Sequence, residues 1–331
     1  MQRRQFNTAA VATLLGTAYA GSAWAQAANP LEQVKVLYGF PPGSAGDICA
    51  RRVAEKFAGT AYSKNAGVVD NKPGAGGRIA LDLLKPSVAD GSVIAHTPFS
   101  ALALYPHIYK QLSYDPFKDF VMLGTSSLIH HGFCVGPKVP ATVTNIKEFL
   151  AWAKANPKDA SYGSPAAGST PHFIGALLGI NSGVELQHVA YRGSVPGITD
   201  VVGGQVAAMV CPHGDMIANH KAGKLRILAT SGKTRSPFVP EVATFAEQGM
   251  ADLTVEEWFG FVGPAKMPPA LIKAANEAIS AALKDKSVTD ALTVVGLIPF
   301  AGTPEEQTRS MKAEFDRWGP LIKKIGFTAE S

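Results

Sequence analysis

One segment of this chain, residues 34–57 with the sequence VKVLYGFPPGSAGDICARRVAEKF, strongly limits the folds that it can adopt. Its first residues alternate as a short β-strand does, with three large apolar residues on one face: Val34, Val36 and Tyr38. Residues 39–46 are rich in glycine and proline, so neither a strand nor a helix can continue through them. A helix is expected next, with one apolar face formed by Ala50, Val53, Ala54 and Phe57. The segment therefore predicts a strand, a tight loop and a helix.

The loop of this segment has the features of an anion site. Asp47 is the expected N-cap of the helix. A glycine-rich loop that ends at a helix N-terminus directs free backbone N–H groups and the positive end of the helix dipole toward one spot, which suits an anion. An ordinary turn between a strand and a capped helix is the alternative, and the segment alone does not decide between the two.

The N-terminus has the pattern of a secretory signal peptide. Arg3 and Arg4 precede an apolar run over residues 9–20, and Ala23-Trp24-Ala25 matches a small-residue cleavage site. We therefore predict a signal peptide over residues 1–25 and a soluble periplasmic protein beyond it. The apolar run is too short for a membrane span. Because the arginine pair matches a twin-arginine signal only loosely, Sec export is favoured over Tat.

Composition excludes several classes of function. The formal net charge is +5, and the basic residues are scattered rather than gathered as in a nucleic-acid-binding arm. The three cysteines, Cys49, Cys134 and Cys211, lie among apolar neighbours, so buried free thiols are favoured over a disulfide. The eight histidines show no metal-ligand spacing, so no metal is expected. No cofactor is expected either, because Gly74-x-Gly76 lacks the third glycine of a dinucleotide-binding fingerprint.

The order of expected elements predicts two α/β units. Strands alternate with helices in both halves of the chain, which indicates mostly parallel sheets flanked by helices. Two extended apolar stretches, near residues 120–135 and 258–262, are suited to crossing between the units. We therefore predict a discontinuous first domain, residues 26–127 with 254–331, and a second domain of residues 128–253. Ligands of such sheets bind at the strand-end loops, which here would face a cleft.

An ordered series of short motifs resembles one known family. The chain looks like a Bug-type receptor of the tripartite tricarboxylate transporter family, an extracytoplasmic solute-binding protein with a two-domain clamshell fold of the type II periplasmic-binding-protein kind. The motifs, which span the chain beyond the signal, are FPPG at 40–43 followed by Asp47, NKPGAGG at 71–77, YDPFKDF at 114–120, YGS at 162–164, GSTPH at 168–172, YRGS at 191–194, TD at 199–200, GGQV at 203–206 and KAGKLR at 221–226.

The resemblance implies a function and a site. Members of this family bind a small carboxylate between the two domains and hand it to a membrane permease. They are not enzymes, and a monomer is expected. The ligand-binding residues that the motifs imply in the first domain are Phe40, Gly43, Ser44, Ala45, Gly46, Asp47, Thr97 and Ser100. Those implied in the second domain are Ser164, Ser169, Thr170, His172, Tyr191, Arg192, Gly193, Ser194 and Cys211.

Physical chemistry gives several of these residues a role. Backbone N–H groups of the first loop can hold a carboxylate, and Ser169 and Thr170 can add hydroxyl donors from the other domain. Arg192 is either a charged donor for a second carboxylate or a solvated surface residue. Asp47 would repel a carboxylate ligand, so helix capping or orientation of a bridging water is the better assignment, with recognition of an amino group a lesser alternative.

Three departures from the family pattern bear on the ligand. The first loop reads Ser44-Ala45-Gly46, without the usual hydroxyl before the aspartate. Residues 210–212 are Val-Cys-Pro where the family has Phe-Asp-Asn, and residues 96–99 are His-Thr-Pro-Phe where it has a polar glycine-rich run. These changes make the expected cleft less polar, so an aromatic or less charged acid fits as well as a tricarboxylate.

Two other functions compete with transport. A hydrolase would need a nucleophile elbow, and Gly132-Phe133-Cys134-Val135-Gly136 matches one formally. An elbow must turn directly into a helix, whereas Pro137 and Pro140 follow here, so a crossing strand is favoured. A receptor that presents its ligand to a sensor kinase is the second alternative, and the sequence does not separate it from transport.

Overall fold

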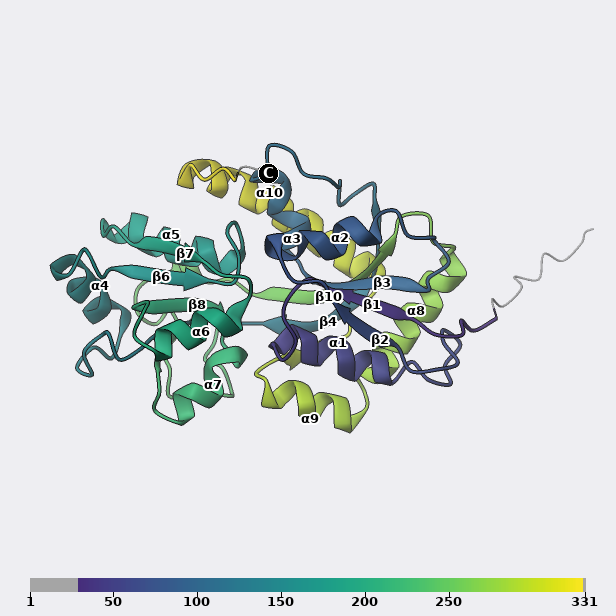
Figure 1. The fold of residues 1–331 in the computed structure, drawn as a ribbon, viewed down its shortest axis with the longest axis horizontal. Coiled ribbons are helices and arrows are strands. Elements are labelled where there is room, and N and C mark those ends of the chain that lie inside the picture. Colours follow the sequence, from purple (N-terminus) through teal and green to yellow (C-terminus); the bar gives the residue numbers. More distant parts are fainter. Residues whose placement is uncertain (1–28, 330–331) are drawn as a thin grey trace, which may run out of the picture.

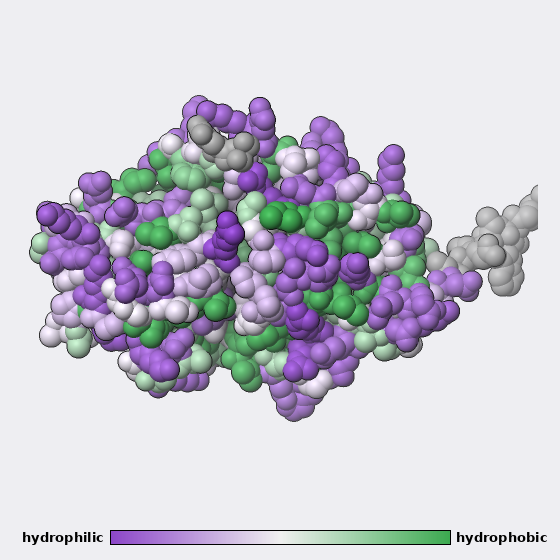
Figure 2. Space-filling model, viewed as in Figure 1, coloured by the Kyte–Doolittle hydropathy of each residue, from purple (hydrophilic) through white to green (hydrophobic). Residues whose placement is uncertain are grey.

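The computed structural model of the chain describes residues 29–329 and shows two α/β domains side by side (Figure 1). The predicted signal peptide lies outside the described residues. On the face seen in Figure 2, hydrophilic residues cover much of both domains, and smaller hydrophobic patches are scattered among these hydrophilic residues. Within residues 29–329, no helix combines the length and the apolar character that crossing a membrane requires.

The first domain is built on a six-stranded mixed sheet. Its strands, in spatial order, are β11 (Ile298–Pro299), β4 (Phe120–Ile129), β10 (Glu257–Pro264), β3 (Val93–Pro98), β1 (Lys35–Tyr38) and β2 (Val68–Asn71). β1 pairs in parallel with β2 and β3, as expected from the strand–helix alternation. β10 is antiparallel to β3 and β4, because it enters this sheet from the other domain.

Helices cover both faces of this sheet (Figure 1). They are α1 (Ala45–Glu55), α2 (Arg78–Leu84), α3 (Ser100–Ala103), α8 (Pro269–Ala282), α9 (Lys286–Val294) and α10 (Pro304–Ile325). Strand alternation sends Val36 and Tyr38 into the core formed with α1, α8 and α9, whereas Leu37 joins the core formed with α2, α3 and α10. The predicted alternation of the first strand therefore explains why α1 packs against the sheet face that carries Val36 and Tyr38.

The second domain has a five-stranded sheet. Its strands, in spatial order, are β7 (Gln187–Ala190), β6 (Ser161–Ser164), β8 (Ala208–Pro212), β5 (His131–Val135) and β9 (Arg226–Thr230). Its helices are α4 (Ile146–Ala155), α5 (Thr170–Ser182), α6 (Ser194–Val202) and α7 (Gly214–Lys221). β6 is parallel to β7 and β8, but β5 is antiparallel to both of its neighbours. Each sheet is therefore mixed, with the predicted parallel order confined to the strands that do not cross.

Two crossings and one helix join the domains. β4 of the first sheet passes into β5 of the second through His130 alone, and the chain returns to the first sheet through β10. The C-terminal helix α10 packs on β4 and α3 and also contacts α5 of the second domain, where Trp318 lies 5.8 Å from Phe173 between ring centroids. The division into residues 26–127 with 254–331 and residues 128–253 stays a prediction.

Several local predictions can be compared with the elements that form. Residues 132–136, the possible hydrolase elbow, lie in and just after β5, a paired strand, which confirms the crossing-strand interpretation. The prediction that Asp47 is a helix N-cap is wrong: α1 begins at Ala45, and Ser44 is its N-cap. The run Thr97-Pro98-Phe99-Ser100 is typical of a turn by its sequence, but β3 continues to Pro98 and α3 begins at Ser100. β10 accounts for this difference, because it pairs with β3 as far as Pro98.

The three cysteines are buried and free. Cys49 is on the buried face of α1 and packs in the core of the first domain, and Cys134 and Cys211 pack with Met209 and Met216 in the core of the second domain. Burial raises the pKa of the Cys49 thiol to about 11 and that of Cys134 to about 12. The interpretation of these residues as buried free thiols is confirmed.

Candidate functional site

A cavity, partly open to solvent, lies between the two domains. Six of the residues expected from the sequence line it: Phe40, Ser44, Gly46, Ser100, Ser169 and Ser194. Ten further residues that were not expected complete the lining: Tyr38, Pro98, Ile129, His131, Pro165, Pro171, Pro212, Asp215, Glu257 and Phe259. Both domains therefore contribute to a single space between them, which is where two-domain proteins commonly bind small molecules.

The first-domain wall of the cavity is largely aromatic. The rings of Tyr38 and Phe40 lie 5.7 Å apart between centroids, and Phe259 completes this side. A Cβ on Gly46 would collide with the Tyr38 hydroxyl and the Phe259 ring, so only glycine allows the start of α1 to approach the aromatic wall this closely. The expectation of a cleft less polar than in the family pattern fits this wall.

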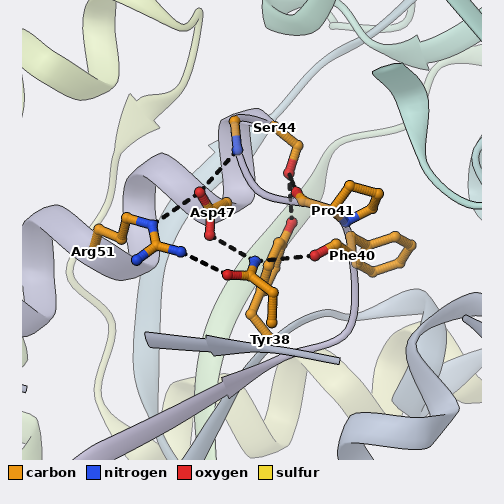
Figure 3. A network of polar contacts seen from close by, with 8 residues as sticks. Tyr38, Phe40, Pro41, Ser44, Asp47 and Arg51 are labelled. Atoms are coloured by element: carbon orange, nitrogen blue, oxygen red, sulfur yellow. Dashed lines mark hydrogen bonds and ion pairs between the residues drawn. The ribbon is translucent and has the colours of Figure 1, made fainter. Parts of the chain in front are cut away.

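The first loop is held in place from behind by Asp47 (Figure 3). One oxygen of this carboxylate accepts hydrogen bonds from the Gly43 N–H at 2.9 Å and from Arg51 Nε at 3.0 Å, and the other accepts from Asn71 Nδ2 at 2.7 Å. Burial opposes ionisation of Asp47, but the hydrogen bonds from Arg51, Gly43 and Asn71 outweigh it and lower its pKa. Asp47 is not among the cavity-lining residues, so it braces the loop from within α1.

The loop itself is shaped for a helix start. Gly43 has a φ of +87°, a conformation that side-chain-bearing residues rarely adopt, and it is exposed beside the cavity rather than in its wall. Ser44 Oγ donates to the Pro41 carbonyl at 3.2 Å and lies 3.4 Å from the Tyr38 hydroxyl. The hydroxyl of Ser44 therefore closes the loop in addition to facing the cavity.

Asp215, which the sequence did not single out, reaches the predicted anion site from the other domain. The N–H of Ala45, the first residue of α1, donates to Asp215 Oδ1 at 2.7 Å. Burial raises the pKa of Asp215, against the opposing effects of the Ser194 hydroxyl and the Ala45 N–H. One donor of the helix N-terminus is thus already used by a carboxylate of the protein itself.

Glu257 is a second carboxylate at the cavity that was not expected. Its side chain lies at the start of β10, and the residue is only 1% exposed. Oε1 accepts from the Ser100 N–H at 3.1 Å, and Oε2 lies 2.7 Å from His131 Nε2. A signal was present in the sequence, because Glu257 directly precedes the apolar crossing at residues 258–262 and a carboxylate there is difficult to bury without partners.

In the second domain, internal hydrogen bonds already engage most of the expected polar groups. The hydroxyls of Ser164 and Ser169 both donate to the Ala166 carbonyl, at 2.9 and 2.7 Å. His172 accepts from the Gly168 N–H through Nδ1 at 2.9 Å. Thr170 Oγ1 is buried without a hydrogen-bond partner among the described residues. Of these four, only Ser169 lines the interdomain cavity.

The remaining expected residues surround the cavity without lining it. Tyr191 and the exposed Arg192 line a neighbouring cavity, where Tyr191 donates its hydroxyl to Asp200 at 2.8 Å. Gly193 has a φ of +109°, and a Cβ there would lie 2.6 Å from Pro41 Cδ of the first domain. Thr97 and Cys211 are buried next to the strand ends. Arg192 therefore fits the surface interpretation better than that of a donor in the cavity.

Within residues 29–329, no group of three or more histidine, cysteine or acidic side chains is arranged to hold a metal ion.

Two α/β domains joined by crossing strands, with a lined cavity between them, define a solute-binding protein of the periplasmic type. The chain matches the model of the tripartite tricarboxylate transporter family receptor over residues 49–327, and it belongs to that family. The resemblance drawn from the motifs is confirmed, as is the clamshell fold. The protein is a periplasmic solute-binding protein and not an enzyme.

Relatives of similar length support this assignment. Protein BugT of Bordetella pertussis is 29% identical over 301 residues, which covers 90% of each chain. The UPF0065 protein of the tcbD–tcbE intergenic region in Pseudomonas sp. strain P51 is 31% identical over 303 residues, covering 91% of this chain and 89% of the relative.

Solved structures agree in fold. A structure described as a periplasmic transporter is 32% identical, with a TM-score of 0.84 over 90% of this chain and 99% of that one. The R. palustris protein Rpa4515, solved with adipate, is 28% identical, with a TM-score of 0.85 over 91% of this chain and 99% of that one.

Proposed function

We propose that this protein captures a small carboxylate in its interdomain cavity in the periplasm and delivers it to a membrane permease of the tripartite tricarboxylate type. The observation that carries the proposal is the cavity itself, which lies between the two domains and is lined by residues of both. The adipate bound to Rpa4515 supports a carboxylate as the class of ligand.

The geometry of the cavity fits such a ligand. Three long helices begin at it, because Ser44 precedes α1, Ser169 precedes α5 and Ser194 opens α6. Helix N-termini present backbone N–H groups that stabilise a carboxylate without a cation. Because α1 belongs to the first domain and α5 and α6 belong to the second, a ligand that contacts α1 together with α5 or α6 favours the closed arrangement.

Capture is tested on protein exported to its native periplasm and purified with its bound solute. Mass spectrometry of the solute released on denaturation should identify a small carboxylate, and titration calorimetry of the emptied protein should show that it rebinds. A released compound without a carboxylate, or a carboxylate that does not rebind, would refute the proposal.

Delivery is tested separately in whole cells. Uptake of the labelled carboxylate should fall when the receptor is deleted and should recover when it is restored. Uptake that is unchanged by the deletion, with capture confirmed, would favour a sensing role over transport.

A further inference from the structure

The charge of the interdomain cavity is unusual for a site that captures an anion. Among the described residues that line it, the ionisable side chains include two carboxylates, Asp215 and Glu257, together with His131, and none is a lysine or arginine. Arg192, the basic residue expected here, lines the neighbouring cavity instead. A fully anionic ligand would therefore meet two carboxyl groups without a lysine or arginine to compensate them, and His131, the histidine of the wall, is already paired with Glu257.

Asp215 also occupies the place where a ligand carboxylate was expected. Its Oδ1 accepts a hydrogen bond from the Ala45 N–H at 2.7 Å, at the N-terminus of α1. A ligand carboxylate at the same helix end would have to share this donor with Asp215, and two carboxyl groups held close in a poorly solvated space cannot both ionise without strong repulsion. The ligand's carboxylate is better placed at the start of α5, where Ser169 lines the cavity, because the Ser194 hydroxyl at the start of α6 already interacts with Asp215.

The Glu257 side of the cavity has an unsatisfied polar atom, Nδ1 of His131. His131 is 1% exposed and uses Nε2 to contact Glu257, but its Nδ1 has no hydrogen-bond partner among the described residues. A buried polar atom without a partner is costly, and at a cavity wall a ligand group can satisfy it. This wall is therefore suited to a polar group that can compensate negative charge.

We propose that the cavity selects a ligand that carries a protonated amine as well as a carboxylate, with the amine against Asp215 and Glu257. The inference rests on the proposed capture of a carboxylate and names the rest of the molecule. The ammonium neutralises the two acids of the wall, and the aromatic surfaces of Phe40 and Phe259 cover the carbon chain between the two charged ends.

The test compares molecules that share a carbon chain and differ at one end. The probes are succinate, 4-aminobutanoate and butane-1,4-diamine, with the longer set of adipate, 6-aminohexanoate and hexane-1,6-diamine. Binding to the full chain is measured by titration calorimetry. In at least one set the amino acid should bind about tenfold or more tightly than the diacid. A preference for the diacid in both sets would overturn the inference and leave carboxylate capture intact.

Variants assign the preference to Asp215. Asp215→Asn should reduce the preference for the amino acid about tenfold, whereas Asp252→Asn, a matched loss of charge at an exposed residue away from the cavity, should not change it. An unchanged preference in Asp215→Asn would overturn the inference, and the wild-type preference remains decisive if this variant does not fold.

Tightest binding of a diamine would refute carboxylate capture while supporting the amine site. Binding of none of the probes would count against both proposals.

Discussion

Nε2 of His131 lies 2.7 Å from Oε2 of Glu257, and this contact connects the two domains where the chain crosses between them. His131 begins β5 of the second sheet, and Glu257 begins β10 of the first. Both residues are 1% exposed. The neighbouring pair, His130 with Glu256, is longer at 3.6 Å and partly solvated. The same Glu257 accepts the Ser100 N–H, so one buried carboxylate joins the crossing, the start of α3 and the cavity wall.

Removal of this carboxylate should destabilise the protein strongly. In Glu257→Ala, His131 Nε2 and the Ser100 N–H lose their partner while remaining buried, which should lower the free energy of unfolding by about 3–5 kcal/mol. Glu256→Ala is the matched control, and it should cost below about 1 kcal/mol because Glu256 is partly exposed. Urea unfolding followed by circular dichroism measures both. Equal effects of the two substitutions would contradict the role assigned to Glu257.

Asp47 should stabilise the first loop through its charge. In Asp47→Asn, an amide replaces a carboxylate that accepts from Gly43, Arg51 and Asn71, so at least one of these donors loses its acceptor. We expect a loss of about 1–3 kcal/mol in the free energy of unfolding. Asp70→Asn, which removes a surface ion pair with Lys72, should cost far less. Chemical denaturation of the two variants checks this, and a larger loss in Asp70→Asn would contradict it.

The sequence predicted the features that depend on local pattern. The strand, loop and helix of residues 34–57 formed as expected. Thr303 and Glu306 have the sequence spacing of a capping box and form one, in which each side chain accepts from the other's backbone N–H. The N-cap of α1 was placed three residues late, because Asp47 looks like a cap but its carboxylate reaches back to Gly43 from inside the helix.

Contacts between distant residues were beyond the sequence. Asp215 meets Ala45 across 170 positions of the chain, and nothing near either residue marks the contact. Glu257 and His131 pair across 126 positions, for the same reason. Five of the six expected lining residues lie within the segments that the family motifs mark, at loops and helix starts, and Ser100 lies outside them. The strand residues of the wall, such as Ile129 and Phe259, depend on how the domains close.

Stability should decrease as the pH falls below neutrality. Burial lowers the pKa of His172 to about 3, and its Nδ1 accepts a hydrogen bond from the Gly168 N–H, which requires the neutral ring. In the unfolded chain a histidine has a pKa of about 6.5, so below that pH the unfolded state binds a proton that the folded state does not. The stability is thus complete above about pH 6.5 and is lost progressively toward about pH 3.

This acid sensitivity is measured by urea unfolding at several pH values. At pH 5 a buried neutral histidine of this kind should cost about 1–2 kcal/mol relative to pH 7.5. His96 and His213, whose pKa values burial lowers to about 3 and about 4, should add to the effect. A free energy of unfolding that stays constant or rises between pH 7.5 and pH 5 would contradict the prediction.

The three cysteines should be structural. Cys49, Cys134 and Cys211 are fully buried, and burial raises the pKa of each thiol, so a thiol reagent should label none of them quickly in the folded protein and all of them in urea. Replacement of each by serine should leave ligand binding in place and cost about 1–3 kcal/mol of stability. Loss of binding in a folded Cys211→Ser variant alone would instead make Cys211 part of the site.

Closure of the two domains should depend on Gly193. Its φ of +109° already disfavours a side chain, and a Cβ there would lie 2.6 Å from Pro41 Cδ in the loop of the opposite domain. Gly193→Ala should therefore disturb the contact between the YRGS turn of the second domain, residues 191–194, and the first loop. We expect ligand affinity to fall about tenfold or more, because binding and closure are coupled.

A matched control separates closure from backbone strain. Gly249 has a φ of +84°, but a Cβ there would meet nothing within 4 Å, so Gly249→Ala carries strain without a contact between the domains. Both variants should lose about 1–3 kcal/mol in the free energy of unfolding, since each places a side chain in a left-handed conformation. Only Gly193→Ala should weaken binding of the solute released from the native protein, measured by titration calorimetry. If both variants bind that solute as wild type does, the turn at Gly193 does not control closure, whereas equal losses of affinity would assign the effect to strain alone.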